Sequence, residues 1–96
     1  MKQVVITDIA IKDIEQAKTW YNKQQPQLGN TFVDYIFESI EQIHKHPLSF
    51  PNKHAFTREM AVKKFPYLII FSIEEDILFI LRVFPCRTNP KKKYKH

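Results

Sequence analysis

Two apolar segments of strand length, separated by a short charged turn, constrain the fold of this chain more than any other feature. Residues 67–73 (YLIIFSI) and 77–84 (ILFILRVF) are rich in β-branched and aromatic side chains, which favour strands. The acids Glu74-Glu75-Asp76 lie between them. The pattern predicts a buried β-hairpin. Because residues 77–84 are almost continuously apolar, we expect the second strand to be central and covered on both faces.

Two amphipathic helices are predicted before the hairpin. Thr7 can cap the first helix, which ends at Gln24-Gln25-Pro26 because proline disfavours the α conformation in the residue before it. Asn30 can cap the second helix, which ends at His46-Pro47. The apolar stripes are Ala10, Ile14, Ala17 and Tyr21 in the first helix and Phe32, Ile36, Ile40 and Ile43 in the second.

The remaining segments complete an α+β pattern. Residues 3–6 are a short strand candidate, residues 47–55 have the composition of a loop, and residues 56–62 form a third extended segment, with Met60 and Val62 on one face. The predicted order is β-α-α-β-β-β, with a helical hairpin packed on one face of a small, mostly antiparallel, twisted sheet. The 96 residues are expected to form one domain, residues 1–96.

The composition argues against a disulfide-stabilised protein and against a membrane-spanning one. The single cysteine, Cys86, excludes an intrachain disulfide, and no apolar segment reaches the roughly 18 residues that a membrane span requires. No signal peptide follows the initial Met-Lys, so we expect a soluble protein of the cytoplasm that contacts no membrane.

The net charge of +5 is concentrated at the end of the chain. Lysines and acids cancel over residues 1–57 and again over residues 58–86. The excess consists of Arg87, Lys91, Lys92, Lys93 and Lys95. A basic tail over residues 87–96 steers a protein toward nucleic acid or acidic protein segments, although it is equally typical of a solvated terminus.

Several kinds of site lack their residue patterns. Cys86 and the four histidines (His44, His46, His54 and His96) have no zinc-ligand spacing, so no metal and no cofactor is expected. No base is nominated for Cys86 as a nucleophile, and the single glycine, Gly29, excludes a glycine-rich phosphate loop.

A set of cations with interleaved tyrosines remains as the candidate functional site. It consists of Arg58, Lys63, Lys64, Arg82 and the basic tail, together with Tyr67 and Tyr94. Such groups are suited to metal-free cleavage of RNA, where a cation stabilises charge on the phosphate and a tyrosine stacks or moves a proton. They are equally suited to binding a nucleic-acid backbone, and Lys63 and Lys64 are also ordinary residues for a strand end.

The chain resembles the RelE/ParE superfamily of toxins from bacterial type II toxin–antitoxin modules. The similarity covers Asp13-Ile14 and Trp20-Tyr21, Leu28-Gly29, the segment from Val62 to Phe71, and the Arg87-x-x-Pro90 ending. It implies the same β-α-α-β-β-β order. It also implies a growth-inhibiting toxin that a small antitoxin, encoded in the adjacent gene and expected to be acidic, neutralises.

Two branches of the superfamily have different targets. The RelE branch cleaves messenger RNA in the ribosome, and the ParE branch blocks DNA gyrase. This chain has Glu59, Ala61 and Leu68 where the RNA-cleaving branch has two lysines and an arginine. The resemblance therefore favours a ParE-like plasmid-stabilisation toxin that acts by binding. A ribosome-dependent endoribonuclease, a degenerate toxin and a basic nucleic-acid-binding module remain alternatives.

The residues expected to act follow from these alternatives. As an RNase the chain would use Arg87 and Tyr94, with Lys63 or Lys64 supplying a cation. As a binding toxin it would contact its target through Arg58, Lys64, Tyr67, Arg82, Arg87, Lys91, Lys92 and Lys93. Antitoxins that fold on their partner need exposed apolar surface, for which Trp20, Val33 and Phe37 are the candidates.

Overall fold

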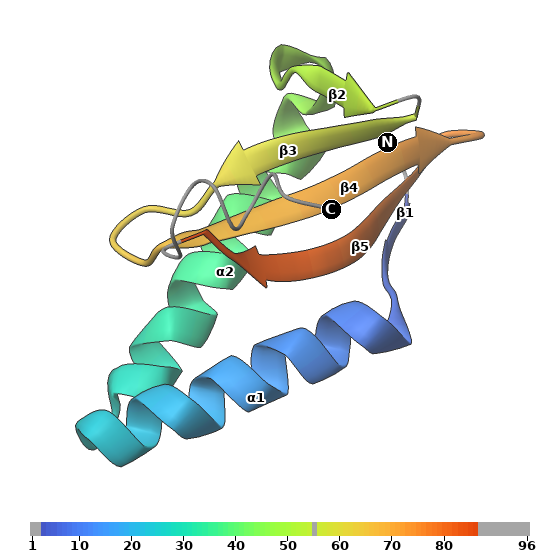
Figure 1. Cartoon of the computed structure of the whole chain (residues 1–96). Helices are drawn as coiled ribbons and strands as arrows, with labels where there is room; N and C mark the ends of the chain where they lie inside the picture. Colours follow the sequence, from blue (N-terminus) through green and yellow to red (C-terminus); the bar gives the residue numbers. More distant parts are fainter. Residues whose placement is uncertain (1–2, 55, 87–96) are drawn as a thin grey trace.

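A five-stranded sheet with two helices on one face forms the structure, a computed structural model that describes residues 3–54 and 56–86 (Figure 1). The elements are β1 (Gln3–Ile6), α1 (Asp8–Gln24), α2 (Leu28–Lys45), the short 3₁₀ helix η1 (Pro47–Ser49), β2 (Asn52–His54), β3 (Thr57–Ala61), β4 (Tyr67–Glu74) and β5 (Ile77–Pro85). The strand order is β1-β5-β4-β3-β2, in which only the β1–β5 pair is parallel. The predicted α+β class is confirmed.

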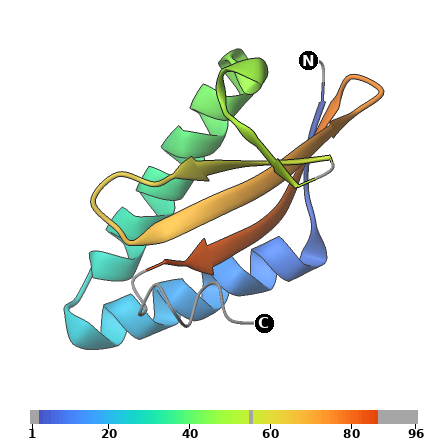
Figure 2. The same cartoon turned by 45° about the horizontal axis from the view of Figure 1, so that its top comes forward.

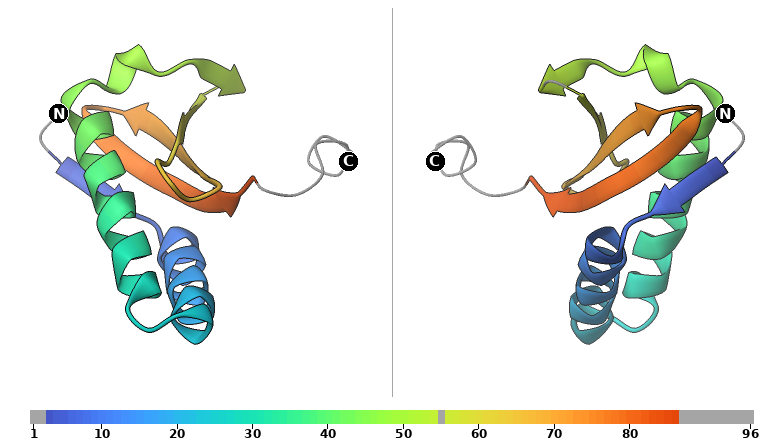
Figure 3. Two further views of the ribbon diagram at one scale, coloured as in Figure 1. Left: turned by 90° about the vertical axis from the view of Figure 1, so that its left-hand side faces the viewer. Right: turned by 90° about the vertical axis from the view of Figure 1, so that its right-hand side faces the viewer.

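The helices form a hairpin against one face of the sheet, and the core lies between these layers (Figure 3). Both predicted apolar stripes are buried, and Phe32, Ile36 and Ile43 of α2 are completely enclosed. The sheet contributes alternate residues of its strands, among them Ile69 and Phe71 of β4 and Leu78 and Ile80 of β5. Met60 and Val62 are both buried, as their predicted common face requires.

Gly29 allows the two helices to approach closely at the start of α2. Its N–H donates a hydrogen bond of 2.7 Å to the Oδ1 atom of Asn22 in α1. A Cβ atom at this position would overlap the backbone carbonyl oxygen of Lys18 and the side chain of Asn22. The single glycine of the chain therefore stands where a side chain would separate the helices.

The predicted hairpin of β4 and β5 is confirmed. Its turn residues, Glu75 and Asp76, both have positive φ angles, of 49° and 67°. Two central residues with positive φ define the type of two-residue turn that matches the twist of antiparallel strands. A bulge follows in β5, because Ile70 pairs with Arg82 whereas the next residue, Phe71, pairs with Ile80.

The expectation that β5 is covered on both faces is wrong. The strand is interior, between β1 and β4, but both helices lie on the same side of the sheet (Figure 2). On the opposite side, called here the open face, Phe79 is half-buried and Phe84 is 40% exposed. Within residues 3–54 and 56–86, no helix or strand forms a second layer over this face.

Two local predictions are also wrong. Residues 47–55 are not only a loop, since η1 and the short strand β2 lie within them. β2 pairs with β3 through main-chain hydrogen bonds, which polar residues can form as well as apolar ones. Asn30 does not cap α2. The helix begins three residues earlier than a cap at Asn30 would require, after Gln27 at a φ of 72°. The amide of Asn30 instead donates a hydrogen bond to the Gln27 side chain.

Candidate binding surfaces

Beyond the end of β1, the start of α1 lies beside β5 and is hydrogen-bonded to it. Thr7, the residue between β1 and α1, donates its N–H to the carbonyl of Ile80 and its hydroxyl to the carbonyl of Leu81, each at 3.1 Å. The same hydroxyl accepts the N–H of Ala10 at 3.2 Å, so the predicted helix cap is confirmed. One short polar side chain thus joins the helix start to the strand.

Asp13, six residues after Thr7, makes a second contact between α1 and β5. Its carboxylate accepts hydrogen bonds from Nε and Nη2 of Arg82, at 2.8 and 3.1 Å, and from the N–H of Val83 at 3.0 Å. The hydrogen bonds from the guanidinium to Asp13, together with the negative charge of Asp13, raise the pKa of Arg82 above its ordinary value. The Asp13 side chain is only 14% exposed, whereas that of Arg82 is 42% exposed. Arg82 is therefore held in one direction while its outer edge still reaches solvent.

The other target-binding candidates that the structure describes, Arg58, Lys64 and Tyr67, do not converge with Arg82. Arg58 donates to the carbonyl of Phe50 at 2.7 Å, on the helix side of the sheet. The Nζ atom of Lys64 lies 5.6 Å from the ring centre of Tyr35 in α2, and the neighbouring Lys63 is exposed. Each of these cations lies against a different part of the fold, so they do not form one continuous site.

Tyr67 is part of the core. Its ring lies 4.9 Å from that of Phe32, centre to centre, and also packs near Tyr21. Only 8% of the residue is exposed, so a target would reach little of it. The predicted site residues Arg87, Lys91, Lys92, Lys93 and Tyr94 lie outside the described residues.

Glu59, Ala61 and Leu68, the positions where the resemblance leads us to expect cations in an RNA-cleaving chain, lie together on the open face. Glu59 and Ala61 of β3 lie opposite Ile70 and Leu68 of β4, and paired residues in antiparallel strands project to the same side. Arg82 pairs with Ile70 from the other side of β4. The described part of this face therefore carries an acid and small or apolar residues around a cation that is already bonded to Asp13.

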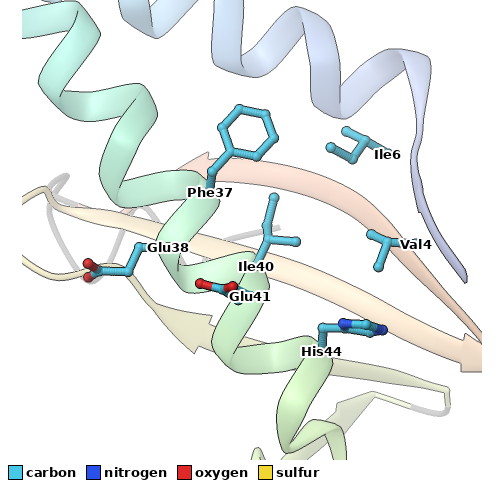
Figure 4. A pocket seen from close by; sticks show the side chains of 7 residues that line it. All are labelled: Val4, Ile6, Phe37, Glu38, Ile40, Glu41 and His44. Atoms are coloured by element: carbon cyan, nitrogen blue, oxygen red, sulfur yellow. The ribbon is translucent and has the colours of Figure 1, made fainter. Parts of the chain in front are cut away.

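A groove lies on the helix side, between α2 and β1 (Figure 4). Its volume is about 520 Å³. The lining residues are Val4, Ile6, Phe37, Glu38, Ile40, Glu41 and His44. Its walls are mainly apolar, and its rim on α2 carries two carboxylates. The sequence identifies Phe37 as a candidate, but β1 has only four residues, and their pattern does not predict which helix lies beside them.

Of the three residues expected to bind an antitoxin, Val33 and Phe37 lie one turn apart on α2, and Trp20 lies on α1. Phe37 is 49% exposed in the groove. Trp20 is 47% exposed on α1, where its ring packs edge-on against Tyr21 at 5.0 Å. Val33, one turn before Phe37, is half-buried. Of the three, Phe37 lines the groove together with other apolar residues, whereas a single exposed apolar side chain is ordinary on a protein surface.

Two further findings concern the described residues. No three His, Cys, Asp or Glu side chains gather there in a way that would hold a metal ion. No helix in residues 3–54 or 56–86 is long and apolar enough to cross a membrane.

This arrangement of a helical hairpin on a mostly antiparallel sheet is that of the RelE/ParE toxins. It superposes on a chain of the chromosomal ParDE toxin–antitoxin system of P. aeruginosa with a TM-score of 0.81, at 18% identity over 91% of this chain and 98% of the other. The isolated RelE toxin of E. coli gives a TM-score of 0.68, at 9% identity over 95% of this chain and 90% of the other. These similarities establish the fold.

The family follows from the sequence. Residues 4–90 match the profile of the ParE toxin of the type II toxin–antitoxin system parDE. This chain belongs to the ParE toxin family, and membership implies a cognate antitoxin as a partner. No curated protein matches the chain at a significant level of sequence similarity.

Proposed function

We propose that this protein inhibits growth by binding DNA gyrase in the cytoplasm, and that the antitoxin encoded beside it neutralises the toxin. Family membership supports the toxin–antitoxin class. A role in plasmid stabilisation would follow if the module is carried on a plasmid, because daughter cells that lose the genes lose the antitoxin supply.

The residues of the open face favour a toxin that binds its target over one that cleaves RNA. Cleaving RNA without a metal requires cations placed where negative charge develops on the phosphate. Glu59, Ala61 and Leu68 occupy the face where such cations would be needed, and a carboxylate repels the RNA backbone. Arg82 is engaged with Asp13. These residues support a toxin that acts through contacts with a protein target.

Purified protein and purified gyrase provide the test. We expect the toxin to inhibit DNA supercoiling and to leave messenger RNA on translating ribosomes uncut. Mapping of transcript ends in cells expressing the toxin is the complementary measurement. Cuts at fixed codon positions that disappear in Arg87→Ala would overturn the proposal in favour of a ribosome-dependent RNase.

Neutralisation has its own test. Co-expression with the adjacent gene, followed by size-exclusion chromatography, should give one complex in which the toxin no longer inhibits growth. The apolar residues Trp20, Val33 and Phe37 are proposed to contribute to this interface. Separate elution of the two proteins at micromolar concentration would contradict the partnership.

A further inference from the structure

The open face carries an acid and a base in one row across neighbouring strands. Glu59 of β3 pairs with Ile70 of β4, and Ile70 pairs with Arg82 of β5 (Figure 1). Paired residues project to the same side of a sheet, so the order along the row is acid, apolar residue, base. Since neighbouring strands lie about 5 Å apart, the two charged positions are separated by about 10 Å.

The next row along the strands is uncharged. It consists of Ala61, Leu68 and Phe84, which pair in the same way across β3, β4 and β5. Ala61 is exposed, Leu68 is half-buried and Phe84 is 40% exposed. The two adjacent rows, called here the two-row patch, therefore combine apolar surface that a partner can cover with one charge of each sign.

The base of the two-row patch is held in a fixed orientation. Nε and Nη2 of Arg82 donate to Asp13, and the Cζ atom of Arg82 lies 5.5 Å from the ring centre of Phe84. A guanidinium can bind a carboxylate along the edge formed by Nε and Nη2 or along the edge formed by Nη1 and Nη2. Asp13 occupies the first edge, and the side chain is 42% exposed. The second edge is thus preorganised for another carboxylate.

The composition of the two-row patch fits a protein better than a nucleic acid. A nucleic-acid backbone carries charge of one sign and is bound by several cations, whereas this patch has a single arginine and a carboxylate that repels phosphates. A protein segment can present an apolar side chain between an acid and a base. Such a segment would complement both charged positions and cover Ile70 and Leu68 between and beside them.

We propose that the two-row patch binds a segment of gyrase that places an Asp or Glu on Arg82, an apolar side chain on Ile70 and Leu68, and a Lys or Arg on Glu59. The inference rests on the proposed function and adds the surface and the chemistry of the segment that it recognises. Asp13 is a positioning residue in this interface, because it touches Arg82 and not the target.

Charge reversal at Glu59 separates local pairing from general attraction. Glu59→Lys raises the net charge from +5 to +7, since one negative charge is lost and one positive charge is gained. Glu15→Lys makes the same change at an exposed position of α1, which lies on the other side of the sheet, and is the matched control. Local pairing predicts that only Glu59→Lys weakens binding, because its lysine then faces a like charge.

The experiment measures the affinity of purified full-length toxin for purified DNA gyrase by titration calorimetry, together with inhibition of supercoiling. Glu59→Lys and Arg82→Gln should each weaken binding by about tenfold or more. Arg82→Lys retains the charge without the planar fork and should recover little of the loss. Ala61→Trp adds a ring to the exposed part of the patch and should weaken binding without any change of charge. Thermal unfolding of each variant checks that the fold is intact.

The outcomes distinguish the inference from the proposed function. If the wild type binds gyrase and the patch variants bind as tightly as Glu15→Lys, the assignment of the patch is wrong although the target is right. Wild-type affinity in Arg82→Lys would exclude recognition by the fork. Losses confined to antitoxin affinity, or to binding of free duplex DNA, would assign the patch to another partner and overturn the inference. A wild type that does not bind gyrase overturns the proposed function itself.

Discussion

Asp13 and Arg82, which are 69 positions apart in the chain, are joined by two hydrogen bonds of 2.8 and 3.1 Å. The same carboxylate accepts the N–H of the next residue, Val83, at 3.0 Å. A single side chain of α1 therefore fixes both the main chain of β5 and the direction of a guanidinium beside it. The two roles can be separated by substitution.

Asp13→Ala should destabilise the fold by about 2 kcal/mol, because the N–H of Val83 then lacks its acceptor beside a nearly buried position. Asp13→Asn should cost clearly less, since its amide oxygen can still accept this hydrogen bond. Urea unfolding at neutral pH measures both. Equal losses in the two variants would mean that the charge, and not the acceptor for Val83, is what matters.

Arg82→Gln should lower the free energy of unfolding by about 1 kcal/mol or less, because the guanidinium is partly exposed and screened. Asp13 raises the pKa of Arg82, so this stabilisation is complete below the unfolded-state pKa and is lost only as pH rises through the higher folded-state value. The difference from the wild type should thus stay constant between about pH 7 and 9. A difference that shrinks over this range would contradict the assignment.

Gly29→Ala should destabilise the protein by roughly 2 kcal/mol or more, although alanine is the better helix former. The added methyl group meets a backbone oxygen of α1, which cannot move aside as a flexible side chain can. Thermal unfolding is the measurement. Asp34→Ala, at an exposed position of the same helix, is the control and should change stability little.

Phe37→Ser should weaken antitoxin binding by about tenfold or more while leaving the melting temperature nearly unchanged, because the side chain is half exposed and lines the groove. Leu48→Ser removes an apolar side chain that is 74% exposed on η1, outside the groove, and serves as the matched control. An equal effect of both substitutions on affinity would indicate nonspecific hydrophobic attraction.

Deleting residues 91–96 removes four of the five excess positive charges. We expect the melting temperature to stay nearly unchanged and toxicity or antitoxin binding to weaken in a salt-dependent way, because isolated surface charges contribute little to folding. Arg87→Ala should have a larger effect than replacement of any single tail lysine. A truncated protein that unfolds would show a structural role, and one that is fully toxic and fully neutralised would exclude a functional one.

The helices and the hairpin could be predicted because their signals are local. Ile36 and Ile40 repeat at helical spacing, and the β4 and β5 sequences are apolar over a strand length. β2 could not be predicted in this way. Its residues Asn52 and Lys53 are polar, and the strand exists through main-chain pairing with β3, which side-chain patterns do not record.

The candidate site was harder to predict because its contacts join distant segments. Arg82 was identified as a cation, but its partner Asp13 looked like any polar residue of an amphipathic helix. Tyr67 was identified as a tyrosine near lysines, yet its strand position turns the ring into the core. Residue type suggested the chemistry, and the topology determined which groups are free to act.

The parallel pairing of β1 with β5 places Gln3 opposite Ile77 and so determines when the fold can be completed during synthesis. At about 5–20 residues per second, the ribosome needs roughly 4–15 s to pass from the first strand to its partner. The helical hairpin, whose contacts are close in sequence, can form during this interval, but the strand that carries Arg82 must then enter between β1 and β4. A nascent chain released before residue 77 therefore has two helices and a broken sheet, and we expect it to be harmless.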